Sequence, residues 1–125
     1  MYIHAKGICH RDIKPHNILL KGKNAAICDF GSAKQLSDKG MNTPYVVSRY
    51  YRAPELILAI RNYNCKIDIW SAGCILAELI LMRPIFVGDS EGETMFKIFE
   101  ILGSPNDTII EFYKKYIQFS PEVFK

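Results

Sequence analysis

Apolar positions follow different spacings in different parts of this 125-residue chain, and the changes divide it into short elements. Met1–Ala5 predicts the end of a helix, because Gly7 stands where a left-handed residue commonly closes one. Ile18–Leu20 and Ala25–Cys28 are apolar runs on either side of Lys-Gly-Lys-Asn, which predicts a small β-hairpin. The stretch Ser32–Tyr51 has neither the helical nor the strand period and predicts a long irregular loop.

The second half of the chain predicts helices. Pro54 opens an apolar helical turn over Leu56–Ile60. Asp68 stands where it would cap a helix over Ile69–Met82, which is apolar on almost every side and therefore typical of the centre of a domain. Two further helices are expected over Gly92–Leu102 and Asp107–Tyr116. Core positions expected in the first of these are Met95, Phe96, Ile98, Phe99, Ile101 and Leu102.

The composition is that of an ordinary soluble domain and excludes disorder or collagen-like repetition. The chain has 16 Lys and Arg against 13 Asp and Glu, a net charge of +3, and 49% apolar residues. There is no run of four basic residues, so we expect no nucleic-acid partner and no membrane-binding face. No signal peptide or membrane-spanning run is present, which favours a cytoplasmic and/or nuclear location.

The four cysteines form no CxxC pair and are expected to be reduced thiols. A metal site that joins Cys9 to His4, His10 and His16 is a weaker alternative for the same segment.

Three motifs in a fixed order carry the candidate chemistry. His10–Asn17 reads HRDIKPHN, Asp29–Gly31 reads DFG, and Ala53–Glu55 reads APE. Each motif alone is also typical of polar turns, but the ordered set is the signature of protein kinases. The hairpin between the first two motifs would bring the loop before its first strand beside the loop after its second.

Phosphoryl transfer explains why these residue types are needed. The reaction needs an oriented hydroxyl and a hard cation that neutralises the phosphates. Asn17 and Asp29 offer the oxygen ligands that Mg²⁺ prefers, while Asp12 would face the hydroxyl. Lys14, two residues later, would touch the transferred phosphate and is typical of the serine/threonine class. The alternative for each is a turn residue or a solvated surface lysine.

Longer stretches resemble one kinase family. The segments DFGSAKQL (Asp29–Leu36), SRYYRAPELI (Ser48–Ile57) and IDIWSAGCILAELIL (Ile67–Leu81) are similar to the glycogen synthase kinase 3, or shaggy, family. The resemblance implies a mainly α fold with a small β-hairpin, as in the α+β C-terminal lobe of the protein-kinase fold. Residues 1–125 would be a partial kinase domain, truncated at both ends, because the Gly-rich loop and ATP-binding lysine of an N-terminal lobe are absent.

The resemblance also assigns roles to individual residues. It implies that Asp12 is the catalytic base, assisted by Lys14, and that Asn17 and Asp29 bind Mg²⁺. ATP would be the cofactor, held by Lys14, Asn17 and Asp29 with Cys28 as a wall of its pocket. Structural roles fall to Arg52, Glu55 and Asp68, the last capping the catalytic loop from the central helix.

Substrates and partners follow from the same resemblance. The expected substrates are proteins with Ser or Thr, often already phosphorylated, whose phosphate would bind Arg11, Lys34 and Arg49. In the alternative, Arg11 and Arg49 only brace the loop. Tyr45 matches the phosphotyrosine of the family, although Pro44 and His16 differ from its usual residues. A groove over Phe96–Tyr116 is expected to dock a helical scaffold protein.

Two alternatives to an active kinase remain open. The chain could be a non-catalytic binding module, or a gene fragment with no role of its own. Because the N-terminal lobe is absent and Ile69–Met82 would lack cover on one flank, we expect this chain alone to be weakly active or inactive and dependent on a partner for stability.

Overall fold

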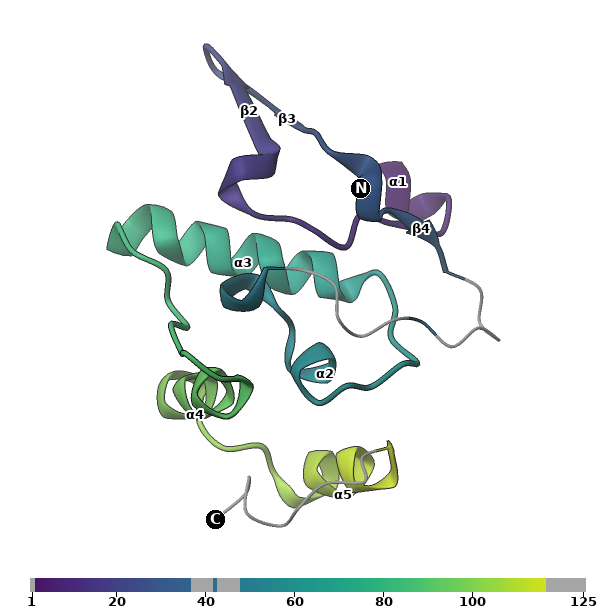
Figure 1. Cartoon of the computed structure of the whole chain (residues 1–125), viewed down its shortest axis with the longest axis vertical. Coiled ribbons are helices and arrows are strands. Elements are labelled where there is room, and N and C mark those ends of the chain that lie inside the picture. The colour runs from purple at the N-terminus through teal and green to yellow at the C-terminus, as the bar shows by residue number, and fades with distance from the viewer. Residues whose placement is uncertain (1, 37–41, 43–47, 117–125) are drawn as a thin grey trace.

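The computed structural model describes residues 2–36, 42 and 48–116, with side chains as far as Glu111. The elements, in chain order, are α1 (Tyr2–Ala5), β1 (Ile8–Cys9), η1 (Pro15–Asn17), β2 (Ile18–Lys21), β3 (Asn24–Ile27), η2 (Phe30–Ser32), β4 (Lys34–Gln35), η3 (Arg49–Tyr51), α2 (Pro54–Ile57), α3 (Lys66–Leu81), α4 (Glu91–Leu102) and α5 (Asp107–Tyr116), where η marks a 3₁₀ turn. Helix α3 crosses the molecule, with the β2–β3 hairpin on one side and α2 and α4 on the other (Figure 1).

Two small antiparallel sheets form in the first third of the chain. The predicted hairpin is confirmed, with Ile18 opposite Ile27 and Lys21 opposite Asn24. Its turn is shorter than expected because only Gly22 and Lys23 lie outside the strands, and Gly22 takes the positive φ of 59° that the turn requires.

The second sheet was not predicted, since β4 lies in the stretch expected to be irregular. Cys9 pairs with Lys34, and two-residue strands this far apart leave no period in the sequence. The rest of the predicted loop lies mostly outside the described residues.

Helix α3 begins earlier than predicted, and the expected cap at Asp68 is wrong. The residue before the helix is Cys65, which makes no side-chain cap, and Asp68 lies inside the first turn. The carboxylate of Asp68 is fully buried and is used by a different segment, as described below. The helix ends at Leu81, followed by Met82 in the left-handed conformation and by Pro84.

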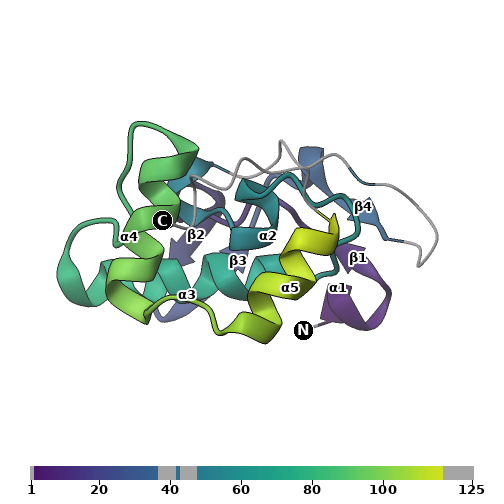
Figure 2. The same cartoon turned by 90° about the horizontal axis from the view of Figure 1, so that it is seen from below.

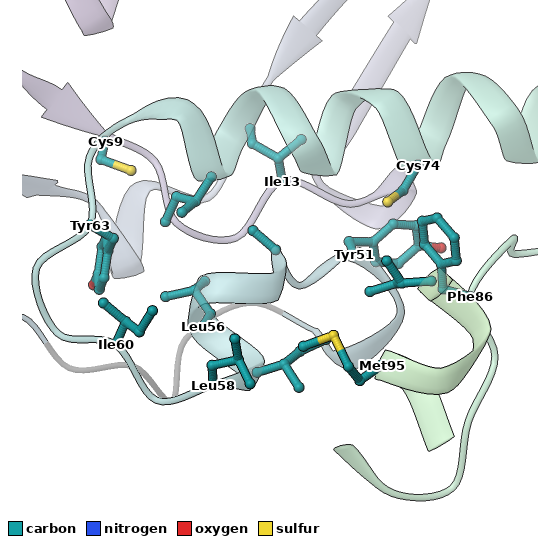
Figure 3. Packing of buried hydrophobic residues seen from close by; sticks show 14 of the residues in the cluster. Cys9, Ile13, Tyr51, Leu56, Leu58, Ile60, Tyr63, Cys74, Phe86 and Met95 are labelled. Atoms are coloured by element: carbon teal, nitrogen blue, oxygen red, sulfur yellow. The ribbon is translucent and has the colours of Figure 1, made fainter. Parts of the chain in front are cut away.

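The hydrophobic core fills the space between α3, η3, α2 and α4 (Figure 3). Cys74 projects from α3 toward Tyr51 and Phe86, Leu56 and Leu58 of the α2 segment lie further along the same core, and Met95 contributes from α4. The described cysteines are all free thiols, as expected. This core fixes α2 and α4 against one face of α3.

The opposite face of α3 is bare, which confirms the expectation that this apolar helix lacks cover on one flank in this chain. Ile69, Leu76, Leu79 and Ile80 are 52%, 62%, 69% and 74% exposed. Leu76 is seven residues after Ile69, and Leu79 and Ile80 are three and four residues after Leu76. All four side chains therefore lie on one side of the helix. Large contiguous apolar surfaces of this kind favour association.

A charge on this bare face is expected to reduce self-association of the chain. Leu76→Glu places a carboxylate among exposed apolar side chains and removes no buried contact, so the fold should be retained. Sedimentation velocity should show a smaller associated fraction than for the unchanged chain. Leu20→Glu, at another exposed leucine on the hairpin, is the control, and an equal effect of both variants would contradict a role of this face.

Helix α4 is amphipathic, but its buried stripe is narrower than predicted. Met95 and Ile98 are buried and Phe99 is partly buried, whereas Phe96, Ile101 and Leu102 are exposed. These three core predictions are wrong. Phe96 and Ile101 lie away from the side of α4 that contacts η3 and α2, and Leu102 shares the side of Met95 but is the last residue of the helix. Figure 2 shows α4 from below, near one end of the molecule. Helix α5 has the predicted bounds. Within the described part of the chain, no helix is long and apolar enough to cross a membrane.

Candidate catalytic site

The loop that begins at His10 is fixed to helix α3 by one buried carboxylate. Asp68 Oδ2 accepts the backbone N–H of His10 at 2.8 Å, and Oδ1 accepts that of Arg11 at 2.9 Å. His4 Nε2, from α1, lies 2.7 Å from Oδ2. Arg11 has a positive φ of 66°, and the two Asp68 bonds hold the backbone in this turn. Two parts of the chain that are 57 to 64 positions apart, the N-terminal stretch with His4, His10 and Arg11 and helix α3, therefore meet at Asp68.

His10 connects this loop to the strand that ends at the DFG motif. Its ring is fully buried, and Nε2 donates to the carbonyl oxygen of Cys28 at 3.0 Å. The backbone N–H of Asp12 donates to Nδ1 at 3.3 Å, so the neutral ring carries its proton on Nε2. The ring also meets Phe30 edge to face, with centroids 4.8 Å apart.

The carboxylate of Asp12 is ionised and has two close polar contacts within the His10–Asn17 segment. Its Oδ2 lies 2.8 Å from Lys14 Nζ and accepts from Asn17 Nδ2 at 3.1 Å. Burial raises the pKa of Asp12, but Lys14, Asn17 and the backbone N–H of Ser48 lower it more, so the net shift is downward. A carboxylate kept deprotonated in this way can accept a hydrogen bond from a hydroxyl.

Asn17 and Asp29 stand at adjoining ends of the hairpin strands. The backbone N–H of Cys28 donates to the carbonyl oxygen of Asn17 at 2.9 Å, which holds the two ends together. The amide nitrogen of Asn17 also donates to the Asp12 carbonyl at 2.8 Å, so its amide oxygen stays available as an acceptor. Asp29 is exposed in a left-handed conformation and accepts from the Gly31 N–H at 3.2 Å.

This donor set fits Mg²⁺. An exposed carboxylate and an amide oxygen are hard ligands, and Mg²⁺ commonly takes one or two such groups together with phosphate oxygens and water. Among the described side chains, no cluster of three or more His, Cys, Asp or Glu could hold a metal, which is against the alternative site around Cys9.

The segment Ser48–Arg52 forms a second wall near Asp12. Tyr51 donates its hydroxyl to Glu78 of α3 at 2.7 Å, and Ser71 donates to the Tyr51 carbonyl at 2.7 Å. Arg52 forms an ion pair with Glu91 of α4, with 2.8 Å between NH1 and Oε1. Both neighbouring helices therefore hold this segment.

The residues predicted to bind a substrate phosphate have separate partners in the structure. Arg11 donates to the Ser32 carbonyl and to the Tyr63 hydroxyl. Lys34 donates to Asn42 at 2.9 Å, and Arg49 donates to backbone oxygens at the start of α4. These hydrogen bonds brace the loop, and the phosphate pocket stays a prediction. Tyr45 lies outside the described residues.

Glu55, in the APE motif, sits in α2 with a largely buried carboxylate. Burial raises the pKa of Glu55. A raised pKa in the folded state means that ionisation of this group costs stability, and the cost appears as the pH rises above its ordinary value of 4.5.

Glu55→Gln is therefore expected to stabilise the fold at neutral pH. The difference in free energy of unfolding between the variant and the unchanged chain should be absent near pH 4 and should grow toward pH 7. Urea denaturation at several pH values measures it. Glu100→Gln, at an exposed pair with Lys97, should show no such trend. If the difference in free energy of unfolding between Glu55→Gln and the unchanged chain were the same at all pH values, ionisation of the buried carboxylate would not destabilise the fold.

Sequence reasoning missed three residues that support the site. They are His4, Tyr63 and Glu91, which contact Asp68, Arg11 and Arg52 respectively. Each contact spans 39 to 64 positions, and no local pattern marks such a pairing. An acidic residue in the first turn of α4 was visible, but it indicates only a favourable interaction with the helix dipole.

The sequence matches a known family over nearly its whole length. The family model described as "Protein kinase domain" matches residues 1–123. The chain therefore belongs to the protein kinase family.

The similarity to the glycogen synthase kinase 3 group is also confirmed. The chain is 54% identical over 107 residues to "Protein kinase gsk3" of Schizosaccharomyces pombe, which covers 84% of this chain and 28% of that protein. It is 53% identical over 106 residues to "Glycogen synthase kinase 1" of Pyricularia oryzae, covering 83% and 27%. "Probable serine/threonine-protein kinase glkA" of Dictyostelium discoideum is 50% identical over 114 residues, covering 90% and 24%. The chain spans about a quarter of the length of these relatives.

Proposed function

We propose that this chain supplies the catalytic loop and substrate-side wall of a serine/threonine kinase that transfers the γ-phosphate of ATP to a protein hydroxyl. The observation that carries the proposal is the Asp12 carboxylate, kept ionised by Lys14 and by Asn17, the residue whose carbonyl bonds to the strand end next to the exposed Asp29. Family membership and the similarity to named kinases support the reaction class. In this proposal the chain corresponds to the C-terminal lobe of the kinase fold.

Asp12 would act as the base that orients and accepts the proton of the substrate hydroxyl. A base of this kind must be ionised and within hydrogen-bonding reach of the hydroxyl. Lys14 would exchange its present bond with Asp12 for one with the transferred phosphate, because a lysine ammonium has three donors and a flexible stem. Positioning and charge stabilisation account for most catalysis in phosphoryl transfer.

Asn17 and Asp29 would hold Mg²⁺, and Cys28 would line the nucleotide pocket. When bound, Mg²⁺ neutralises charge on the phosphate oxygens of ATP. The hydrogen bond between the Cys28 N–H and the Asn17 carbonyl keeps the two proposed ligands on one side of the hairpin. The partly buried Cys28 lies at the same end of the hairpin, directly before Asp29.

Protein substrates and a scaffold are the partners that this function implies. A substrate already phosphorylated nearby would place its phosphate at Arg11, Lys34 and Arg49, which requires these side chains to leave their present partners. An apolar pocket lined by Leu58, Phe99, Leu102 and Ile109 supports the docking of a helical scaffold beside α4, because such a pocket can receive the apolar face of a partner helix.

A chimaera tests the proposed function. In the chimaera, this chain replaces the matching 107 residues of the fission-yeast relative gsk3, which provides the remaining parts of a kinase. Transfer of labelled phosphate from ATP to a serine peptide, with little transfer to the same peptide carrying tyrosine, is the expected result. A folded chimaera that phosphorylates neither peptide would contradict the proposal. Priming the peptide with a downstream phosphoserine tests the phosphate pocket separately.

A further inference from the structure

Two arginines, at the first position of the 3₁₀ turn η3 and directly after it, bind the segment that leads into helix α4 and the first residue of that helix. Arg49 donates to the backbone oxygens of Gly88 and Asp89. Arg52, three residues later, forms the ion pair with Glu91 at 2.8 Å. We call these five residues the η3–α4 clamp.

The ion pair in this clamp is more enclosed than an ordinary surface pair. The Arg52 side chain is only 14% exposed, while that of Glu91 is 41% exposed. An isolated surface pair contributes little because water screens it, but a partly buried arginine that loses its carboxylate keeps a poorly solvated charge. Removal of the Glu91 charge is therefore expected to displace Arg52 toward solvent.

The clamp completes the support of the wall that faces Asp12. On its α3 side, η3 is held through Tyr51, by Glu78 and Ser71. On its other side, η3 is held through Arg49 and the adjacent Arg52, by the contacts of the clamp. The backbone N–H of Ser48, immediately before η3, is among the groups that lower the pKa of Asp12, after Lys14 and Asn17. A shift of η3 would therefore change the surroundings of Asp12.

We infer that Glu91 is a positioning residue, which holds Arg52 and through it keeps η3 at the correct place beside Asp12 for the substrate hydroxyl. The part of this inference that concerns a substrate hydroxyl rests on the proposed function. The part that concerns the support of η3 by Glu91 depends only on this chain. The clamp also couples α4 to the site. A protein that binds the exposed side of α4 and displaces this helix would move Glu91, and with it Arg52 and η3.

Hydrogen exchange in the full chain tests the clamp. The N–H groups of Tyr51 and Arg52 close η3 by bonding to Ser48 and Arg49 carbonyls at 3.0 and 3.2 Å. Glu91→Ala should speed exchange of these two amides about tenfold through local opening, without a matching change in the α3 amides. Glu91→Asp should restore part of the protection. Glu100→Ala, on the same helix but paired only with exposed Lys97, should leave η3 unchanged.

Two results of that experiment would overturn the inference. Equal exchange of η3 amides in Glu91→Ala and the unchanged chain would show that the ion pair does not hold the turn. A rise spread equally over α3 would show general loss of stability. In the chimaera, Glu91→Ala should raise KM for the serine peptide several-fold more than KM for ATP. If the unchanged chimaera transferred no phosphate, the proposed function would be contradicted. The hydrogen-exchange result would still show whether Glu91 holds η3.

Discussion

Replacement of Asp12 by asparagine is expected to lower kcat of the chimaera by about 10²- to 10⁴-fold, the usual contribution of a general base. The amide keeps the shape of the side chain and can still meet Lys14 and Asn17, but it has neither the charge nor the basicity of the carboxylate. KM for ATP should change little, because Asp12 is assigned to the hydroxyl and not to the nucleotide. Steady-state kinetics with a serine peptide measures both constants.

Asp107→Asn is the matched control for the Asp12 variant. Asp107 opens α5 in an exposed position and is assigned no role in the reaction, so kcat should stay within the error of the unchanged chimaera. If Asp12→Asn retained most of kcat, the carboxylate would not be the base, and the residue that orients the hydroxyl would have to be sought elsewhere.

The largest effect on stability is expected at Asp68. Asp68→Ala removes a buried carboxylate and leaves the N–H groups of His10 and Arg11 without their acceptor. Breaking a buried charged network in this way costs about 3–5 kcal/mol, against a typical total of about 5–15 kcal/mol for a domain. Urea denaturation of the chain should therefore show a large drop in midpoint or no folded baseline.

Asp68→Asn should be less harmful than Asp68→Ala, because the amide oxygen can still accept one of the two backbone hydrogen bonds. Asp107→Ala, at an exposed position, should change the midpoint only slightly. Equal, small effects of all three variants would show that the catalytic loop keeps its conformation without this carboxylate.

The sequence predicts the local elements better than the contacts between them. The bounds of α5 and the pairing of the hairpin follow from short-range patterns, and the structure confirms both. The ordered motifs likewise predict that Asp12, Asn17 and Asp29 lie close to one hairpin. These features depend on residues that are near one another in the chain.

Other features depend on pairings that no local pattern encodes. Asp68 looks like a helix cap because it precedes an apolar run, but its carboxylate bonds to His10 and Arg11, 58 and 57 positions away. Burial of α4 was overestimated for a similar reason. A periodic pattern shows which side of a helix is apolar, whereas the width of the buried stripe depends on how many neighbours meet it.

The all-round apolar pattern of α3 predicts a helix with one uncovered flank in this chain, and the structure confirms that exposure. The same run of apolar residues supplies the core on one face and the bare surface on the other. The chain spans about a quarter of the length of its relatives. The contacts that form the candidate site do not involve this exposed face of α3.

Calorimetric titration with ATP in the presence and absence of Mg²⁺ tests the central claim most directly. The chimaera should bind ATP more tightly when Mg²⁺ is present, and Asp29→Ala should remove this difference while Asp107→Ala keeps it. Equal dependence on Mg²⁺ in the unchanged chimaera and in Asp29→Ala would contradict the account, because the metal would then be held without the carboxylate on which the proposed site depends.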